Sequence, residues 1–107
     1  MTAASIVAEI IEKIGRLATH GELRAYLFGS ARRRDSAWSD IDILIICEVD
    51  EDGQLARESL ADICMHYPID LLIMTSQEEA EFDFIRSEKC QQIANSRVSP
   101  AKLVPLG

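Results

Sequence analysis

The stretch that decides the fold is LFGSARRRDSAWSDIDILI, which runs from Leu27 to Ile45. It begins at the end of a short, aromatic-containing run bounded by glycines, Leu23 to Phe28, which is typical of a strand. It ends inside an almost continuously apolar and β-branched run, Ile41 to Cys47, which indicates a strand buried on both faces. The polar, arginine-rich connection from Gly29 to Ser39 is short for a parallel crossover. We therefore expect these two strands to be antiparallel.

The remaining segments predict one small α/β domain, in which helices flank a mixed central sheet of three or slightly more strands. Steps of three and four between apolar residues indicate helices, and Pro68 ends one of them before a third strand. Ser76 and Glu79 have the spacing of a capping box, which predicts that a last helix begins there. We expect the domain to span residues 1–98 and the tail, residues 99–107, to be irregular. The other expected elements are a helix from Thr2 to about Thr19, a turn from Glu48 to Gly53, a helix from Gln54 to His66, a strand from Ile69 to Met74 and a helix from Ser76 to about Asn95.

Composition and charge exclude several classes of protein. The 107 residues suffice for one compact domain, and eighteen acidic against eleven basic residues give a net charge of −7. That charge repels nucleic-acid phosphates, so we expect no direct binding to nucleic acid. No apolar stretch has the length that a membrane span requires, and glutamates interrupt the N-terminal segment where a secretory signal would be apolar. Three widely spaced cysteines indicate reduced thiols, and we expect a cytoplasmic protein.

Three aspartates are expected to meet at one edge of the sheet. Asp40 and Asp42 are two residues apart at the start of the second strand, so their side chains share a face. Asp70 is the second residue of the third strand. A helix of about three turns joins the two strands, which favours a parallel pair whose beginnings lie at the same edge. The antiparallel first strand returns Gly29 and Ser30 to that edge as well.

This cluster predicts phosphate chemistry supported by a metal. Three carboxylates at one point repel one another unless cations neutralise them, and oxygen ligands without histidine or cysteine favour Mg²⁺ or Mn²⁺. Two such ions would clamp the attacking and leaving oxygens of a phosphoryl or nucleotidyl transfer. Gly29 allows close approach of the backbone to a phosphate, and Ser30 can donate a hydrogen bond to it. The three candidate metal ligands and catalytic residues are Asp40, Asp42 and Asp70.

Each part of the cluster also has a simpler interpretation. An isolated aspartate at a strand start is usually a solvated turn residue, and Arg32, Arg33 and Arg34 can be a solvated basic loop instead of contacts for a triphosphate. However, Asp42 and Asp70 each interrupt an otherwise apolar strand, which is costly unless the carboxylate is paired or binds a metal. Two such exceptions at one edge favour a functional site.

These residues resemble the motif of the DNA polymerase β-like nucleotidyltransferase superfamily, and the size and element order resemble its minimal members. Gly29-Ser30, the Asp40-Ile41-Asp42 triplet and Asp70 match the three parts of that motif in order, and the resemblance covers roughly residues 23–95. It implies that the three aspartates hold two Mg²⁺ ions and that Asp70 helps to activate the attacking hydroxyl. It further implies that Gly29 and Ser30 bind the nucleotide phosphates. Arg32 and Arg33, which lie beside this pair in the sequence, are the candidate residues to neutralise a triphosphate. Many minimal members have glycine where this chain has Arg34.

The resemblance also implies a reaction and a partner. Family members most often transfer AMP from ATP to a hydroxyl, and minimal members are commonly encoded beside a small all-helical protein of the HEPN type. Such pairs are toxin–antitoxin systems, in which the nucleotidyltransferase is the antitoxin and can transfer AMP to a tyrosine of the toxin. Two alternatives stay open: an antitoxin that neutralises its partner by contact alone, and a nucleotidyltransferase that acts on a small molecule. A homo-oligomer is also compatible with the sequence.

Overall fold

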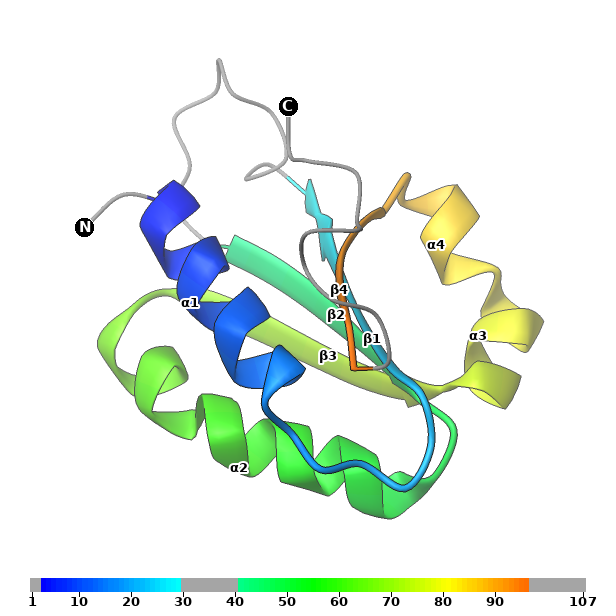
Figure 1. Ribbon diagram of the computed structural model, residues 1–107. Helices are drawn as coiled ribbons and strands as arrows, with labels where there is room; N and C mark the ends of the chain where they lie inside the picture. The colour runs from blue at the N-terminus through cyan, green and yellow to red at the C-terminus, as the bar shows by residue number, and fades with distance from the viewer. Residues whose placement is uncertain (1–2, 30–40, 97–107) are drawn as a thin grey trace.

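The computed structural model describes residues 3–29 and 41–96, which form a four-stranded sheet with helices on both faces (Figure 1). The strand order across the sheet is β3-β2-β1-β4. This confirms the predicted α/β class and mixed sheet, with one strand more than the minimum of three. The elements are α1 (Ala3–Gly15), β1 (Leu23–Phe28), β2 (Ile41–Cys47), α2 (Asp50–His66), β3 (Ile69–Thr75), α3 (Ser76–Phe82), α4 (Phe84–Ser87) and β4 (Gln91–Asn95).

Strand directions follow from the lengths of the connections. β1 and β2 are antiparallel, in a register that places Phe28 opposite Asp42. β2 and β3 are parallel, because α2 carries the chain back across the sheet, and their register places Asp42 opposite Asp70. Both predicted pairings are therefore confirmed. Their combined effect is to bring the end of β1 and the starts of β2 and β3 to one edge.

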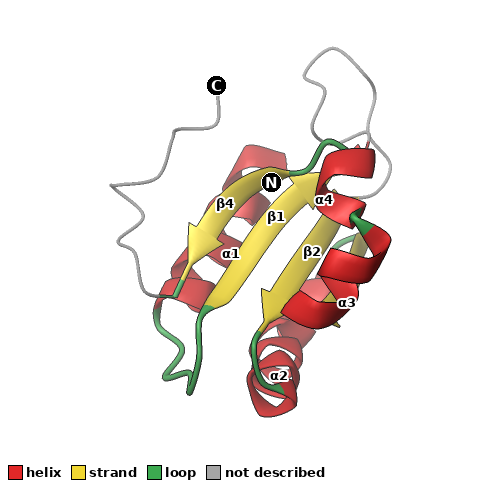
Figure 2. Cartoon of the chain, turned by 90° about the vertical axis from the view of Figure 1, so that its right-hand side faces the viewer, coloured by secondary structure: helices red, strands yellow, loops and turns green. Residues whose placement is uncertain are grey.

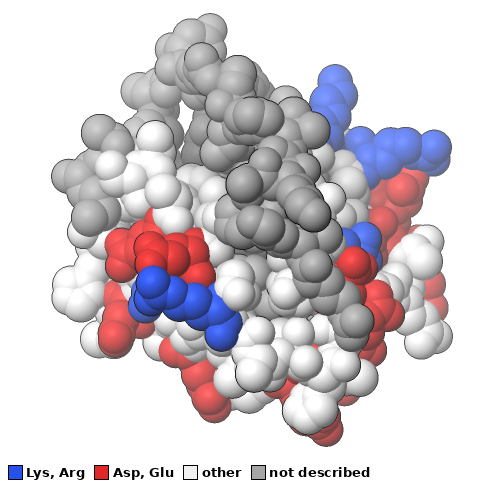
Figure 3. Space-filling view, viewed as in Figure 1, with Lys and Arg blue, Asp and Glu red and all other residues white. Residues whose placement is uncertain are grey.

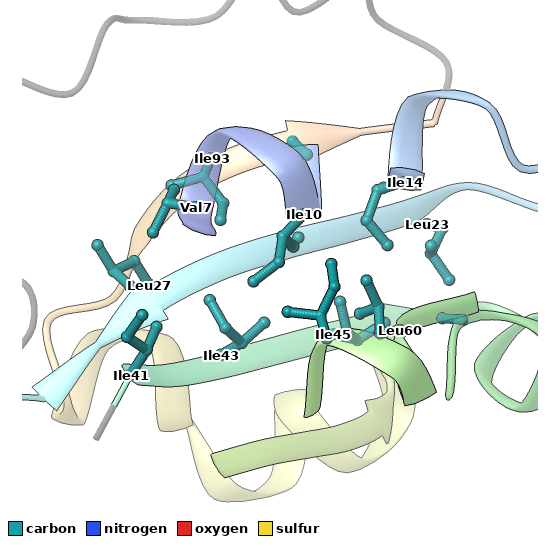
Figure 4. Packing of buried hydrophobic residues seen from close by; sticks show 14 of the residues in the cluster. Val7, Ile10, Ile14, Leu23, Leu27, Ile41, Ile43, Ile45, Leu60 and Ile93 are labelled. Carbon is teal, nitrogen blue, oxygen red and sulfur yellow. The ribbon is translucent and has the colours of Figure 1, made fainter. Parts of the chain in front are cut away.

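The main core lies between the sheet and the pair formed by α1 and α2 (Figure 4). β2 supplies alternate residues to this face and is buried along nearly its whole length, as its apolar run predicts. From α1, residues spaced by three and four pack against these strands, which places one face of the helix in the core. The fully buried residues of largest volume in this layer include Ile6, Ile10, Ile14, Leu23, Ile41, Ile43, Ile45 and Leu60.

A smaller apolar cluster lies on the opposite face of the sheet, beside α3 and α4. Figure 2 shows these two short helices in front of the sheet and α1 and α2 behind it. Tyr26, Leu44, Ile46 and Met74 form the buried part of this cluster. This face also carries Asp42, because it alternates with the residues that point into the main core. The candidate site thus lies on the less covered side of the sheet.

The prediction of one long helix from Ser76 to about Asn95 is wrong. The helical region divides at Asp83, whose φ of 51° is left-handed, and ends before Lys89, whose φ is 53°. The chain then forms β4, which pairs antiparallel with β1. Pairing with β1 satisfies backbone groups along a strand that would otherwise lie at the edge, and this tertiary gain outweighs local helix propensity.

Three predicted boundaries also change. α1 ends at Gly15 and not near Thr19, and α2 begins at Asp50, within the acidic run that the sequence assigned to a turn. The capping box of α3 uses Thr75 and Glu78 in place of Ser76 and Glu79. The predicted tail, residues 99–107, lies outside the described residues. Within the described part of the chain, no helix is both long enough and apolar enough to cross a membrane.

Candidate functional site

Three neighbouring strands each place one residue in a single row across the sheet. Phe28 at the end of β1 is opposite Asp42 on β2, and Asp42 is in turn opposite Asp70 on β3. Residues directly opposite each other share a face, so the two aspartates point to the same side and are close neighbours. Asp42 is half-buried and Asp70 is exposed. The predicted meeting of Asp42 with Asp70 is therefore confirmed as a placement.

Gly29 lies against the Asp42 side chain. It follows β1 directly, and its φ of +73° is a backbone conformation that favours glycine. A Cβ atom at this position would lie 3.0 Å from Asp42 Cγ and would overlap Asp42 Oδ2. The missing side chain thus allows the carboxylate to approach the backbone of the turn. The predicted closeness of Gly29 to the strand aspartates is therefore confirmed for Asp42.

The other predicted site residues lie outside the described part of the chain. They are Ser30, Arg32, Arg33 and Asp40, together with Arg34, whose side chain replaces the glycine of many minimal relatives. Their assignments as phosphate contacts and as a metal ligand stay predictions. The described residues that the structure brings together are Gly29, Asp42 and Asp70.

An aromatic pair borders the row of aspartates and was missed by the sequence analysis. The rings of Phe28 and Phe84 meet edge to face, with centroids 5.1 Å apart and planes at 88°. Phe82 falls within the range of the predicted long helix, and in the structure its side chain is 66% exposed. The left-handed break at Asp83 shifts the helical phase and turns Phe84 toward the sheet instead. No local sequence pattern signals that break.

The side-chain chemistry at the row fits a hard divalent cation. Two carboxylates in register on one face repel each other, and a cation bound by their oxygens would relieve that repulsion. Oxygen donors of this kind suit Mg²⁺. Within residues 3–29 and 41–96, no group of three or more histidine, cysteine, aspartate or glutamate residues is arranged to hold a metal ion. The third predicted ligand, Asp40, is not among those residues.

A different carboxylate, Asp52, is fully buried and serves the fold. Its Oδ1 accepts a hydrogen bond from the His20 amide at 2.9 Å, and its Oδ2 accepts one from the Gly21 amide at 2.8 Å. The imidazole Nδ1 of His20 lies 3.4 Å from Oδ1. Burial acts to raise the pKa of Asp52, but these hydrogen bonds outweigh it and hold the pKa below its usual value. Asp52 therefore ties the start of α2 to the loop between α1 and β1.

Comparison with known proteins identifies a family. A family model described as a nucleotidyltransferase domain matches residues 7–99, which is most of the chain and includes every predicted site residue. Neither the curated proteins nor the solved structures contain a significant match.

Proposed function

We propose that this chain, which belongs to the nucleotidyltransferase domain family, transfers a nucleoside monophosphate from a nucleoside triphosphate to a hydroxyl group. The observation that carries the proposal is the register that sets Asp42 beside Asp70, with Gly29 against the Asp42 carboxylate. Gly29, Asp42 and Asp70 are the residues of the expected motif that lie in the described part of the chain, and their closeness at the starts of β2 and β3 supports the proposal.

The chain's own residues have distinct roles in this proposal. Asp42 and Asp70, with Asp40, would hold Mg²⁺, which when bound neutralises charge on the triphosphate and the carboxylates. The acceptor oxygen forms a bond to the α-phosphorus, the bond from that phosphorus to the bridging oxygen breaks, and pyrophosphate leaves. Asp70 is the exposed carboxylate of the row and accepts the proton of the attacking hydroxyl.

The triphosphate is held by the turn after β1. Gly29 provides a backbone that a phosphate can approach closely, since it has no side chain and a left-handed φ. Ser30 donates a hydrogen bond, and Arg32 and Arg33 supply positive charge in a protein whose net charge is −7. We propose ATP as the nucleotide, on the basis of the resemblance to minimal nucleotidyltransferases.

The proposed acceptor is a tyrosine hydroxyl of a small all-helical HEPN-type toxin, for which this chain acts as the antitoxin. The resemblance to minimal family members supports this pairing, and the acidic surface suits a basic partner. A cytoplasmic location belongs to the same proposal. It is consistent with the structure, in which Cys47, Cys64 and Cys90 form no disulfide.

Intact-mass spectrometry tests the proposal. The chain is incubated with ATP, Mg²⁺ and the protein encoded by the neighbouring gene, and both masses are recorded. We expect the neighbour to gain the mass of one or more AMP groups, and we expect no gain with Asp42→Asn. The matched control is Asp62→Asn, an exposed aspartate on α2 away from the row, which should retain full transfer.

Two results would contradict the proposal in different ways. A stable complex without any mass gain would assign the chain to the antitoxins that act by contact alone. Transfer that is equally fast in Asp42→Asn would remove the assigned site, provided that the variant folds like the wild type. Transfer to a small hydroxyl compound but not to the neighbour would move the acceptor to the small-molecule class.

A further inference from the structure

The outer edge of β3 is the feature that the proposed function leaves unused. β3 is the last strand of the sheet on its side, and among residues 3–29 and 41–96 it pairs with β2 alone. Its sequence, IDLLIMT, contains neither proline nor lysine, two common means of protecting an edge strand from pairing. Leu72 is 37% exposed in the middle of it. The strand therefore offers a regular apolar edge next to Asp70.

We infer that this edge binds the acceptor as an added β-strand, an extended polypeptide segment that presents a hydroxyl side chain beside Asp70. The inference rests on the proposed function, because it names the class of acceptor that the same site takes. It predicts that backbone pairing with β3 places the acceptor, while the side chains of the segment decide which protein is modified.

Alternate residues of β3 direct their backbone N–H and C=O groups away from β2, where an added strand could bond to them. The Ile41 amide donates to the Pro68 carbonyl at 2.8 Å, and Ile41 is opposite Ile69 in the parallel register. Alternate residues of a parallel strand bond to the same neighbour, so the backbone of Asp70 and Leu72 faces β2. By the same alternation, the N–H and C=O groups of Ile69, Leu71 and Ile73 face outward.

An added strand would bring its side chains to the row of aspartates. Neighbouring strands lie about 4.7–4.9 Å apart, and directly opposite residues have Cβ atoms roughly 4.5–5.5 Å apart. A serine, threonine or tyrosine opposite Asp70 would thus extend the row formed by Phe28, Asp42 and Asp70 by one place. Its hydroxyl would lie next to the carboxylate that is proposed to accept its proton.

A pocket beside the far end of β3 offers a second point of recognition. It has a volume of about 190 Å³ and lies between the end of β3, the first turns of α2 and the start of α3. Ile73 and Thr75 line it from the strand, Arg57 lines it from α2, and Glu78 lines it from α3. A side chain of the added strand several residues from the hydroxyl can occupy it.

The acidic residues near the end of β3 favour a basic segment as the bound polypeptide and disfavour a second copy of this chain. α3, which follows β3 directly, contains three glutamates and no basic residue. Figure 3 shows acidic side chains gathered on the side of the molecule where α3 lies. A second copy would bring the same acidic helix and its own Asp70 to the interface, and both would repel. A segment that alternates apolar and basic residues complements Leu72 and these carboxylates together.

The test uses a peptide library as the acceptor. Its members are about ten residues long, enough for one strand, with tyrosine, serine or threonine fixed at the centre and the other positions randomised. Labelling by ATP carrying a radioactive α-phosphate is measured with the wild type, Leu71→Pro and Leu71→Ala. Proline removes the outward N–H at this position, whereas alanine keeps it and shortens the same side chain.

We expect Leu71→Pro to raise the KM for labelled peptides by about tenfold or more, the scale of lost backbone hydrogen bonds, with the KM for ATP unchanged. Leu71→Ala should show little of this effect. Far-UV circular dichroism and urea unfolding check that both variants fold. If Leu71→Pro does not fold, peptides N-methylated at alternate residues replace it. Two such peptides are compared, one methylated at the odd positions and one at the even positions. Only one of them should fail to be labelled by the wild type, because only one set of N–H groups pairs with β3.

Three results overturn the inference while leaving the proposed function intact. The first is equal KM values for the peptides with Leu71→Pro and Leu71→Ala, and the second is labelling of a folded neighbouring protein but of no peptide. The third is a wild-type dimer that Leu71→Pro converts to a monomer without a change in peptide KM, which would assign the edge to self-association. Absence of labelling on peptides and proteins alike would instead remove the proposed function.

Discussion

Two kinds of aspartate in this protein have different surroundings. Asp52 is fully buried at the start of α2, and the amides of His20 and Gly21 donate to its two oxygens. Asp42 and Asp70 lie side by side on neighbouring strands, where each is the other's like-charged neighbour. Hydrogen bonds from its own chain lower the pKa of Asp52, whereas Asp42 and Asp70 place two carboxylates next to each other on one face of the sheet.

This difference separates a carboxylate that serves stability from two carboxylates that we propose to bind a metal ion. A buried charge persists in a fold only if hydrogen bonds compensate its lost hydration. Two like charges on one face persist if the benefit comes from something they bind, such as a divalent cation. Substitutions at Asp42 and Asp52 should therefore have opposite effects on transfer and on stability.

The largest effect is expected from Asp42→Asn on nucleotide transfer. Loss of one negative oxygen from the predicted metal site should lower the transfer rate by about a thousandfold or more, which corresponds to roughly 4 kcal/mol. The free energy of unfolding should change by less than it does in Asp52→Ala, because the amide keeps the shape of the carboxylate at this half-buried position. Rates come from labelled ATP and stability from urea unfolding. A large loss of stability in this variant would show that Asp42 belongs to the structural class.

Asp52→Ala should produce the opposite pattern. It leaves the amides of His20 and Gly21 without the buried carboxylate that accepts from them, so we expect a loss of about 2–4 kcal/mol in the free energy of unfolding. Under conditions where the variant is folded, its transfer rate should match that of the wild type. Asp50→Ala, an exposed acid in the same helical turn, is the control and should cost about 0.5 kcal/mol.

Gly29→Ala tests whether transfer depends on the close approach of the Gly29 backbone to the Asp42 carboxylate. A Cβ at this left-handed position overlaps the Asp42 carboxylate, so we expect a loss of about 1–2 kcal/mol in stability and at least tenfold in transfer. Gly15→Ala is the matched control, because a Cβ there meets nothing within 4 Å. That variant should be neutral or slightly more stable. Full transfer by Gly29→Ala would argue against the close approach of turn and carboxylate.

The smallest effect is the pH dependence contributed by Asp52. Its pKa is lowered in the folded state, so the unfolded chain takes up the proton first as the pH falls. The stabilisation is complete above the unfolded pKa of about 3.9 and is lost as the pH falls through the folded value. Urea midpoints measured from pH 6 downward should decline less steeply in Asp52→Asn than in the wild type. Parallel declines would mean that other groups control acid stability.

The candidate site was predictable to the extent that it depends on strands and connection lengths. Asp42 and Asp70 interrupt apolar runs, and the helix between their strands implies a parallel pair, so their meeting follows from local pattern. Asp52 was not predictable as a buried residue, since its partners, His20 and Gly21, lie about thirty residues earlier in the chain. The acidic residues around Asp52 are typical of a solvated turn, so the local sequence does not indicate that it is buried.

The sequence by itself determined the three strands that carry the row of aspartates, together with their directions. Their apolar runs have no alternative that buries them, and the connections permit one direction each. Only the tertiary structure decided that residues 91–95 form a strand and that Phe84 packs on Phe28. Residues 91–95 can pair with β1, and Phe84 can pack on Phe28, only once the sheet has formed. The hydrogen bonds and burial gained there outweigh the weak local preference of these residues for a helix.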